Sequence, residues 1–203
     1  MSSIQKAGRF IVMLWGAPAA GKTTVARSLL KELRRRRGLT LPHLSTDQLN
    51  RAILGEDFLG DVRGALYDGL IAMAGNILGS GGGVLLDGTF LYPEMRERIR
   101  NLARERRAVL VSIQVACSLP TRRQRNARRP DAERVPEAWL ERAHYRAMAG
   151  RFHSDMVVDT EAVSTEEAVE RILELMSWRL ERGNRFPALI RQVVPGKVYC
   201  AGL

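Results

Sequence analysis

The sequence contains little cysteine, little histidine and no long apolar run, and each shortage excludes a class of protein. Cys117 and Cys200 are too few and too far apart for a disulfide framework or a thiolate metal site. The histidines lack the spacing of zinc ligands. The apolar stretch Phe10–Trp15 is too short to span a bilayer, and it runs into a glycine loop instead of a small-residue cleavage site. We therefore expect a protein of the reducing cytoplasm without a membrane span.

Acidic residues are also scarce: 22 of them face 32 basic residues, which gives a formal net charge of +10. This charge favours an anionic partner, such as a nucleotide, a phosphorylated metabolite or a nucleic acid. Most of the excess is arginine spread over predicted helices, where solvated helix faces explain most of it. No strand interleaves basic and aromatic residues as single-strand nucleic-acid binders do. We therefore keep nucleic acid as an alternative partner without favouring it.

Short apolar runs alternate with helical patterns along the whole chain. Strands are predicted at Phe10–Trp15, His43–Ser45, Val84–Leu86, Val109–Ala116 and Met156–Val158. Helices are predicted from Val25 to a stop at Gly38, at Asp61–Leu78, Pro93–Arg106, Thr121–Arg129 and Pro136–Met148, and from the capping pair Ser164 and Glu167 to a stop at Gly183. Parallel strands need crossover connections, so this alternation predicts an α/β fold with a five-stranded parallel sheet between two layers of helices. We expect one domain over residues 1–182, with a helical lid at about 121–149 and an appendage at 183–203.

The first loop carries the most specific motif. Gly16-x-x-x-x-Gly21-Lys22-Thr23 matches the Walker A pattern, and it follows a strand and opens a helix as that pattern requires. The glycines let successive N–H groups point at phosphate oxygens, and the helix N-terminus adds its positive dipole end. Lys22 can reach the outer phosphates and the Thr23 hydroxyl can ligate Mg²⁺. We expect ATP to be held by Gly16, Ala17, Pro18, Ala19, Ala20, Gly21, Lys22, Thr23 and Thr24.

Two acidic residues lie at the ends of the second and third predicted strands. Asp47 follows the second strand, and the carboxyl ends of parallel strands share one edge, so Asp47 should face the crevice of the phosphate loop. There it can accept the proton of an attacking hydroxyl, and its alternative role is a helix N-cap, for which Ser45 and Thr46 compete. Asp87 ends the third strand and resembles a Walker B acid that holds Mg²⁺, with a turn residue before Gly88 as the alternative.

A predicted helix near the middle of the chain carries a row of arginines. Arg122, Arg125 and Arg129 share one helix face, and Arg128 lies beside it. A mobile helix with such a row can close over a triphosphate and neutralise the charge that develops during phosphoryl transfer. A solvated basic face is the alternative.

Taken together, the segments resemble the P-loop small-molecule kinases of the AAA-type P-loop group, which include adenylylsulfate kinase, chloramphenicol phosphotransferase and the kinase domain of polynucleotide kinases. The resemblance runs from about Phe10 to Leu180 and rests on the segments GAPAAGKT, STDQL, LLDGTF, RRQRNARR and VVDTEAVSTEEAVERIL. It implies a three-layer P-loop NTPase fold, magnesium-ATP as the phosphoryl donor and an acceptor hydroxyl near the acid of STDQL. By this likeness the catalytic residues are Lys22, Asp47, Arg125 and Arg129, with Arg125 also binding the nucleotide and Thr23 holding the metal. We expect Asp87 to be the second metal-holding residue.

The acceptor side is less clearly marked. Polynucleotide kinases tend to have an arginine shortly after the equivalent of Asp47, where this chain has Asn50 and then Arg51. We expect Asp47 and Arg51 to bind the acceptor, and Phe90, Tyr92 and Arg96 to line its pocket after the third strand. The sequence thus predicts an ATP-dependent phosphotransferase that acts on a hydroxyl of a small metabolite or antibiotic. The alternatives are a polynucleotide 5′-hydroxyl kinase and a nucleotide-binding module that transfers no phosphate.

Overall fold

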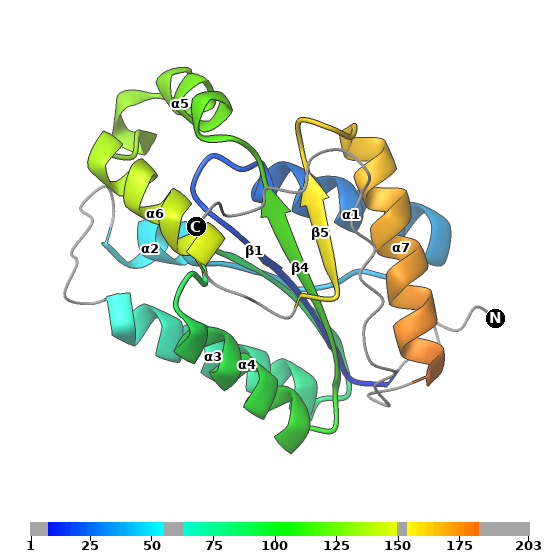
Figure 1. Ribbon diagram of the computed structural model, residues 1–203. Coiled ribbons are helices and arrows are strands. Elements are labelled where there is room, and N and C mark those ends of the chain that lie inside the picture. Colours follow the sequence, from blue (N-terminus) through cyan, green and yellow to red (C-terminus); the bar gives the residue numbers. More distant parts are fainter. Residues whose placement is uncertain (1–7, 55–62, 150–153, 183–203) are drawn as a thin grey trace.

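The computed structural model describes residues 8–54, 63–149 and 154–182, and strands and helices alternate along them (Figure 1). The strands are β1 (Phe10–Trp15), β2 (His43–Ser45), β3 (Gly83–Gly88), β4 (Val109–Ala116) and β5 (Met156–Asp159). The helices are α1 (Lys22–Arg37), α2 (Thr46–Leu54), α3 (Arg63–Gly79), α4 (Pro93–Glu105), α5 (Leu119–Ala127), α6 (Glu137–Ala149) and α7 (Thr165–Arg182), with the short 3₁₀ helix η2 at Asp131–Glu133.

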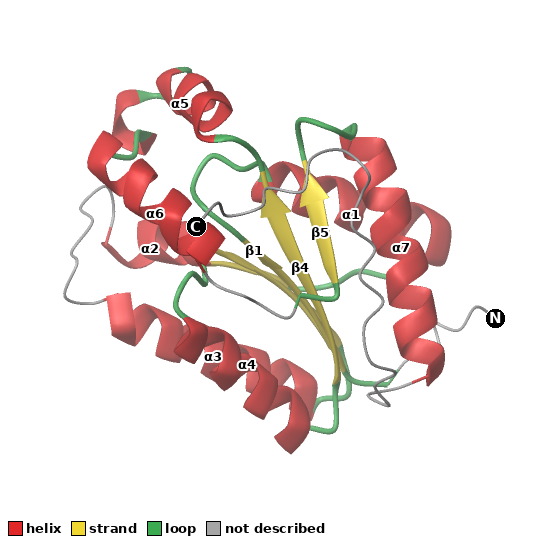
Figure 2. Cartoon of the chain, in the orientation of Figure 1, coloured by secondary structure: helices red, strands yellow, loops and turns green. Residues whose placement is uncertain are grey.

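The five strands form one parallel sheet in the order β2-β3-β1-β4-β5. β1 is central: Phe10 lies opposite Gly83 of β3 on one side and Val109 of β4 on the other. All strands therefore end at the same edge, where the connections to the following helices gather (Figure 2). The α/β fold with a five-stranded parallel sheet, predicted from the alternating pattern, is confirmed.

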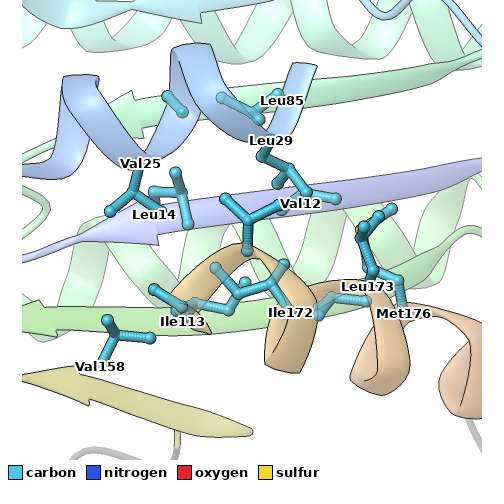
Figure 3. Close-up of a cluster of buried hydrophobic side chains, with 14 of the residues drawn as sticks. Val12, Leu14, Val25, Leu29, Leu85, Ile113, Val158, Ile172, Leu173 and Met176 are labelled. Carbon is cyan, nitrogen blue, oxygen red and sulfur yellow. The ribbon is translucent and has the colours of Figure 1, made fainter. Parts of the chain in front are cut away.

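Helices cover both faces of the sheet, which explains why β1 is apolar at every position. Val12 and Leu14 pack with Leu29 of α1 and Ile172 of α7 on one face (Figure 3). Alternate residues of β1 belong to a second core with α3 and α4 on the other face. Apolar side chains on both faces stabilise a strand that is covered on both sides. Its sequence is therefore a continuous apolar run instead of an alternation of apolar and polar residues.

Two predicted helix ends are present in the structure. Gly38 ends α1 in the left-handed conformation, with φ of 61°, and its N–H donates to the carbonyl of Arg34. At the start of α7 the hydroxyl of Ser164 accepts a hydrogen bond from the N–H of Glu167 at 3.1 Å. The predicted stop at Gly183 and the appendage at 183–203 lie outside the described residues.

Helix α2 was not predicted from the sequence. It begins at Thr46, directly after β2, so no loop separates the strand from the helix. The hydroxyl of Ser45 accepts a hydrogen bond from the N–H of Gln48 at 3.4 Å and caps the helix.

Within the described ranges, no helix is both long and apolar enough to cross a membrane.

Candidate active site

The loop between β1 and α1 has the backbone conformation that its glycines predict. The φ angles are 150° at Gly16, 60° at Ala19 and 94° at Gly21, all outside the range that side chains prefer. Gly16 also has no room for a side chain, because a Cβ there would lie 2.1 Å from the carbonyl oxygen of Val115 in β4. Its N–H donates to the carbonyl of Thr89 at 3.2 Å. The loop thus packs closely between β4 and the connection that follows β3.

Replacing Gly16 should therefore disrupt the loop and the sheet edge together. For Gly16→Ala we expect a loss of about 2 kcal/mol or more in the free energy of unfolding, since the new methyl group collides with backbone at a strained φ. Chemical denaturation measures this loss. Gly69→Ala is the matched control: it lies within α3 with open space around the added Cβ, and it should gain about 0.5–1 kcal/mol. An unchanged denaturation midpoint in Gly16→Ala would show that Gly16 and the Val115 carbonyl are not packed as closely as the structure indicates.

Lys22 begins α1 and is buried, with 8% of its surface exposed. Its Nζ donates a hydrogen bond to the carbonyl of Ala17 at 3.0 Å, so the side chain folds back over the loop. Burial lowers the pKa of Lys22, whereas the charges of Asp87 and Asp47 raise it. Both predicted acidic residues therefore act on the ammonium group. Because an ammonium has three donors, Lys22 can bind phosphate oxygens while it keeps its loop contact.

A hydroxyl and a carboxylate meet beside the loop, as a magnesium site requires. Thr23 Oγ1 donates to Asp87 Oδ2 at 2.8 Å, and Nε2 of His43 lies 3.5 Å from the same oxygen. Burial raises the pKa of Asp87, but the contacts with His43, Lys22 and Thr23 outweigh it and leave the pKa below its usual value. The carboxylate is therefore ionised. Asp87 lies within β3, so the alternative of a turn residue is wrong.

These oxygen ligands fit Mg²⁺, which binds one or two protein oxygens together with substrate phosphates and water. Across the described part of the chain, no group of three or more His, Cys, Asp or Glu side chains is placed to hold a metal ion. A magnesium ion shared with a triphosphate does not need such a group. Thr23 and Asp87 are thus the residues that would hold it.

Asp47 lies in the first turn of α2 with an exposed side chain. The start of α2 packs closely against Gly88 at the end of β3, because a Cβ added to Gly88 would come within 2.9 Å of Thr46 Cγ2. Ser45 supplies the helix cap, which leaves the carboxylate of Asp47 available for another role. The effect of Asp47 on the pKa of Lys22 shows that the two charges lie within electrostatic reach.

A pocket of about 260 Å³ adjoins the loop on the side of β5 and α7. Arg125 of α5 reaches across it, donating through Nη1 to Thr160 Oγ1 at 2.7 Å and through Nη2 to the Thr160 carbonyl at 3.1 Å. Thr160 in turn donates to the carbonyl of Ala20 in the loop at 3.0 Å. The pocket is lined by Gly21, Thr24, Val25, Arg125, Thr160, Val163, Ser164, Thr165 and Ala168. Sequence reasoning missed Thr160, although its position directly after β5 places it at the functional edge.

The arginines of the predicted lid face different ways. Arg129 is half-buried just beyond the end of α5 and lies close enough to Lys22 for its charge to lower the pKa of that lysine. Arg122 is 1% exposed and contacts Nδ1 of His144 in α6. The prediction of one row facing the triphosphate is therefore wrong for Arg122, which joins the two lid helices. Arg125 contacts Thr160 beside the loop, and the charge of Arg129 acts on Lys22 within it.

Two residues expected to line the acceptor pocket are buried instead. Phe90 has no exposed surface and packs against Tyr67, with ring centroids 5.5 Å apart. Arg96 is 1% exposed, lies 4.5 Å from the centre of the Trp15 ring and donates to the carbonyl of Phe90. Burial, followed by the charge of Arg100, lowers the pKa of Arg96 to about 10. Both residues support the connection after β3, where Phe90 has a φ of 37°, and neither forms an open surface.

Tyr92 and Arg51, also expected on the acceptor side, contact the region predicted as a lid. Tyr92 is 41% exposed, and the guanidinium of Arg146 in α6 stacks 4.6 Å above its ring and contacts its hydroxyl. Arg51 of α2 pairs with Glu133 of η2 at 3.1 Å. α2 and the connection after β3 are thus joined to the lid at two separate points.

Comparison with known proteins finds one family model and several similar folds. The family model for the AAA domain matches residues 11–154. The fold is similar to that of the APS kinase CysC from Mycobacterium tuberculosis in complex with AMPPNP and APS, with 17% identity, a TM-score of 0.63 and coverage of 83% of this chain and 98% of that one. The fold is also similar to that of a gluconokinase from Sinorhizobium meliloti 1021, with 18% identity, a TM-score of 0.58 and coverage of 85% of this chain and 94% of that one. A third similar fold is that of Kti12 from Chaetomium thermophilum in complex with ADP-AlF3, with 20% identity, a TM-score of 0.62 and coverage of 81% of this chain and 97% of that one. No curated protein sequence matches this chain.

Proposed function

Because the chain belongs to the AAA domain family and has the fold of the P-loop kinases, we propose that it moves the γ-phosphoryl group of Mg-ATP to a hydroxyl of a small metabolite or antibiotic. The observation that supports this most is that the ammonium group of the phosphate loop lies within electrostatic reach of two carboxylates. Lys22 is buried in the loop, and the charges of Asp87 and Asp47 both act on its pKa. Each of these groups has a separate task in phosphoryl transfer.

In phosphoryl transfer each group would have the following role. The acceptor oxygen forms a bond to the γ-phosphorus while the bond from that phosphorus to the bridging oxygen of ADP breaks, and the hydroxyl proton passes to Asp47. Lys22 and the amides of the loop stabilise the charge that develops on the phosphoryl oxygens. Magnesium, when bound, would neutralise charge on the β- and γ-phosphates. Thr23 and Asp87 would hold it there.

The nucleotide itself would extend from the loop towards Arg125. Its base would enter the pocket between Gly21 and Thr160, and Arg125 would cover it from the side of α5. Arg129 would reach the outer phosphates, since its charge already acts on Lys22. Closure of the helices α5 and α6 would exclude water, so that the phosphoryl group passes to the acceptor instead of being hydrolysed.

The direct test is to incubate the protein with Mg-ATP and fractionated metabolites and to analyse the products by mass spectrometry. We expect one class of compound to gain the mass of a single phosphoryl group. Lys22→Ala, tested in parallel, should give no product. A complete set of fractions without any phosphorylated product, although the protein binds Mg-ATP, would refute the proposal.

The magnesium assignment is tested separately through Thr23. Thr23→Val keeps the shape of the side chain and removes the hydroxyl, so the Mg²⁺ concentration for half-maximal turnover should rise by about tenfold or more. Binding of ATP without Mg²⁺ should change little, because the loop amides are intact. Turnover measured across a magnesium titration decides this, and an unchanged magnesium requirement would remove Thr23 from the metal site.

A nucleotide-binding module that transfers no phosphate is the second candidate function. The similarity to Kti12 supports it, because that protein's complex holds the nucleotide species ADP-AlF3 with no acceptor named. In such a module Asp47 would have no kinetic role. The module would therefore bind Mg-ATP and leave every metabolite fraction unchanged.

A further inference from the structure

The connection between α5 and α6 is closed at its base by one buried side chain. Asn126 of α5 is 8% exposed. Its Nδ2 donates to the carbonyl of Val135 at 2.9 Å, and its Oδ1 accepts a hydrogen bond from the N–H of Val135 at 3.0 Å. The side chain thus holds together the two ends of the loop formed by residues 127–134. Compact loops whose ends lie close together frequently have a functional role.

Arg129 belongs to this loop, and its backbone is held at two points. Its N–H donates to the carbonyl of Asn126 at 3.1 Å, and its own carbonyl accepts a hydrogen bond from Nε of Arg134 at 3.1 Å. Arg134 also donates through Nη2 to the carbonyl of Ala127, where α5 ends, at 3.0 Å. The position of Arg129 therefore depends on the closed loop and not on α5 alone.

The charge of Arg129 acts on the phosphate loop. Burial lowers the pKa of Lys22 in that loop and the charge of Arg129 lowers it further, whereas Asp87 and Asp47 raise it. Two cations within reach of each other repel, so the loop that carries Arg129 must hold it there against this repulsion. An anion placed between the two cations, such as the outer phosphates of a nucleotide, would attract both of them.

We propose that Asn126 is a positioning residue for Arg129: by closing the loop at Val135, it holds the guanidinium in place to bind the outer phosphates of the nucleotide. Asn126 itself is buried and acts only through Arg129. A cation held in this way needs little rearrangement when charge develops on the phosphoryl group. This inference rests on the proposed function, to which it adds the residue that keeps one of the cations in position.

A double-mutant cycle tests this coupling by calorimetry with the full chain and Mg-ATP. The four proteins are wild type, Asn126→Ala, Arg129→Gln and the variant with both substitutions. AMP is titrated as a second ligand, because it lacks the outer phosphates. Gln124→Ala is the matched control, at an exposed position on the same helix. Melting temperatures verify that the variants fold, and Asn126→Ser, whose side chain is too short for both contacts, replaces Asn126→Ala if that variant does not.

We expect Arg129→Gln to weaken Mg-ATP binding by about tenfold, because it removes a charged contact with the phosphates. Asn126→Ala should weaken Mg-ATP binding by about threefold to tenfold and leave AMP binding unchanged. When Arg129 is already replaced, Asn126→Ala should weaken Mg-ATP binding by less than about twofold, since a residue that acts only through Arg129 has nothing left to position. Gln124→Ala should match wild type with both ligands.

Three results would overturn the inference. Equal losses from Asn126→Ala with and without Arg129 would show that the amide supports the fold and does not act through Arg129. An equal loss of AMP binding would show the same, and unchanged Mg-ATP binding in Asn126→Ala would leave the amide no role at the phosphates. Because the cycle measures binding, a protein that binds Mg-ATP but phosphorylates no metabolite would refute the proposed function, while the cycle would still decide on Asn126.

Discussion

Lys22→Met is expected to reduce phosphoryl transfer by about 10³-fold or more. The substitution keeps the length of the side chain and removes a buried ammonium that the structure places over the phosphate loop, 3.0 Å from the Ala17 carbonyl. Removing one preorganised donor from a water-poor site costs about 10²–10³ in rate, and here a full charge is lost as well. Transfer is measured by single-turnover kinetics with the identified acceptor, and the loss should appear in kcat and in kcat/KM.

Lys31→Met is the control for this prediction. Lys31 lies on the same helix α1 with an exposed side chain, so its loss changes the net charge equally without touching the loop. Its turnover should stay within about twofold of wild type, as surface charges contribute little. If both variants lost activity to the same extent, the effect would come from overall charge and not from the contact of Lys22 with phosphate.

Asp47→Asn is expected to lower kcat by about 10²–10⁴-fold, the usual contribution of a positioned general base. The KM for ATP should change little, because the loop and the pocket beside Thr160 do not include Asp47. The fold should tolerate the change, since Ser45 and not Asp47 caps α2. Steady-state kinetics with varied ATP and varied acceptor separate the two effects.

Asp68→Asn is the matched control for the base. Asp68 forms an ion pair with Arg98 at 2.6 Å on the surface of α3 and α4, so its neutralisation removes one carboxylate away from the loop. We expect wild-type turnover in that variant. Unchanged turnover in Asp47→Asn would remove Asp47 from the mechanism.

The parts that local pattern determines could be predicted from the sequence. β1 and β4 have the bounds that their apolar runs indicate, because a strand buried on both faces must be apolar throughout. The phosphate loop followed from its glycines, and Gly16 is indeed required by the close approach of Val115. Lys22 and Thr23 were predicted from the Walker A pattern, and Asp87 from its place at the end of the third strand.

The parts that tertiary contacts determine could not be predicted. Nothing in the spacing of Arg122 distinguishes it from Arg125, yet contact with α6 buries the first and leaves the second beside the nucleotide pocket. Phe90 follows a strand as a pocket residue would, but its positive φ turns it into the core.

The central claim is that the loop between β1 and α1 binds the triphosphate of a nucleotide, and calorimetry with Mg-ATP tests it most directly. We predict a saturable heat of binding with one site per chain, much weaker binding of AMP, and weaker binding of Mg-ATP by Lys22→Met than by Lys31→Met. If no purine triphosphate gave a heat of binding in the presence of magnesium, the site and the enzyme proposed from it would both be contradicted.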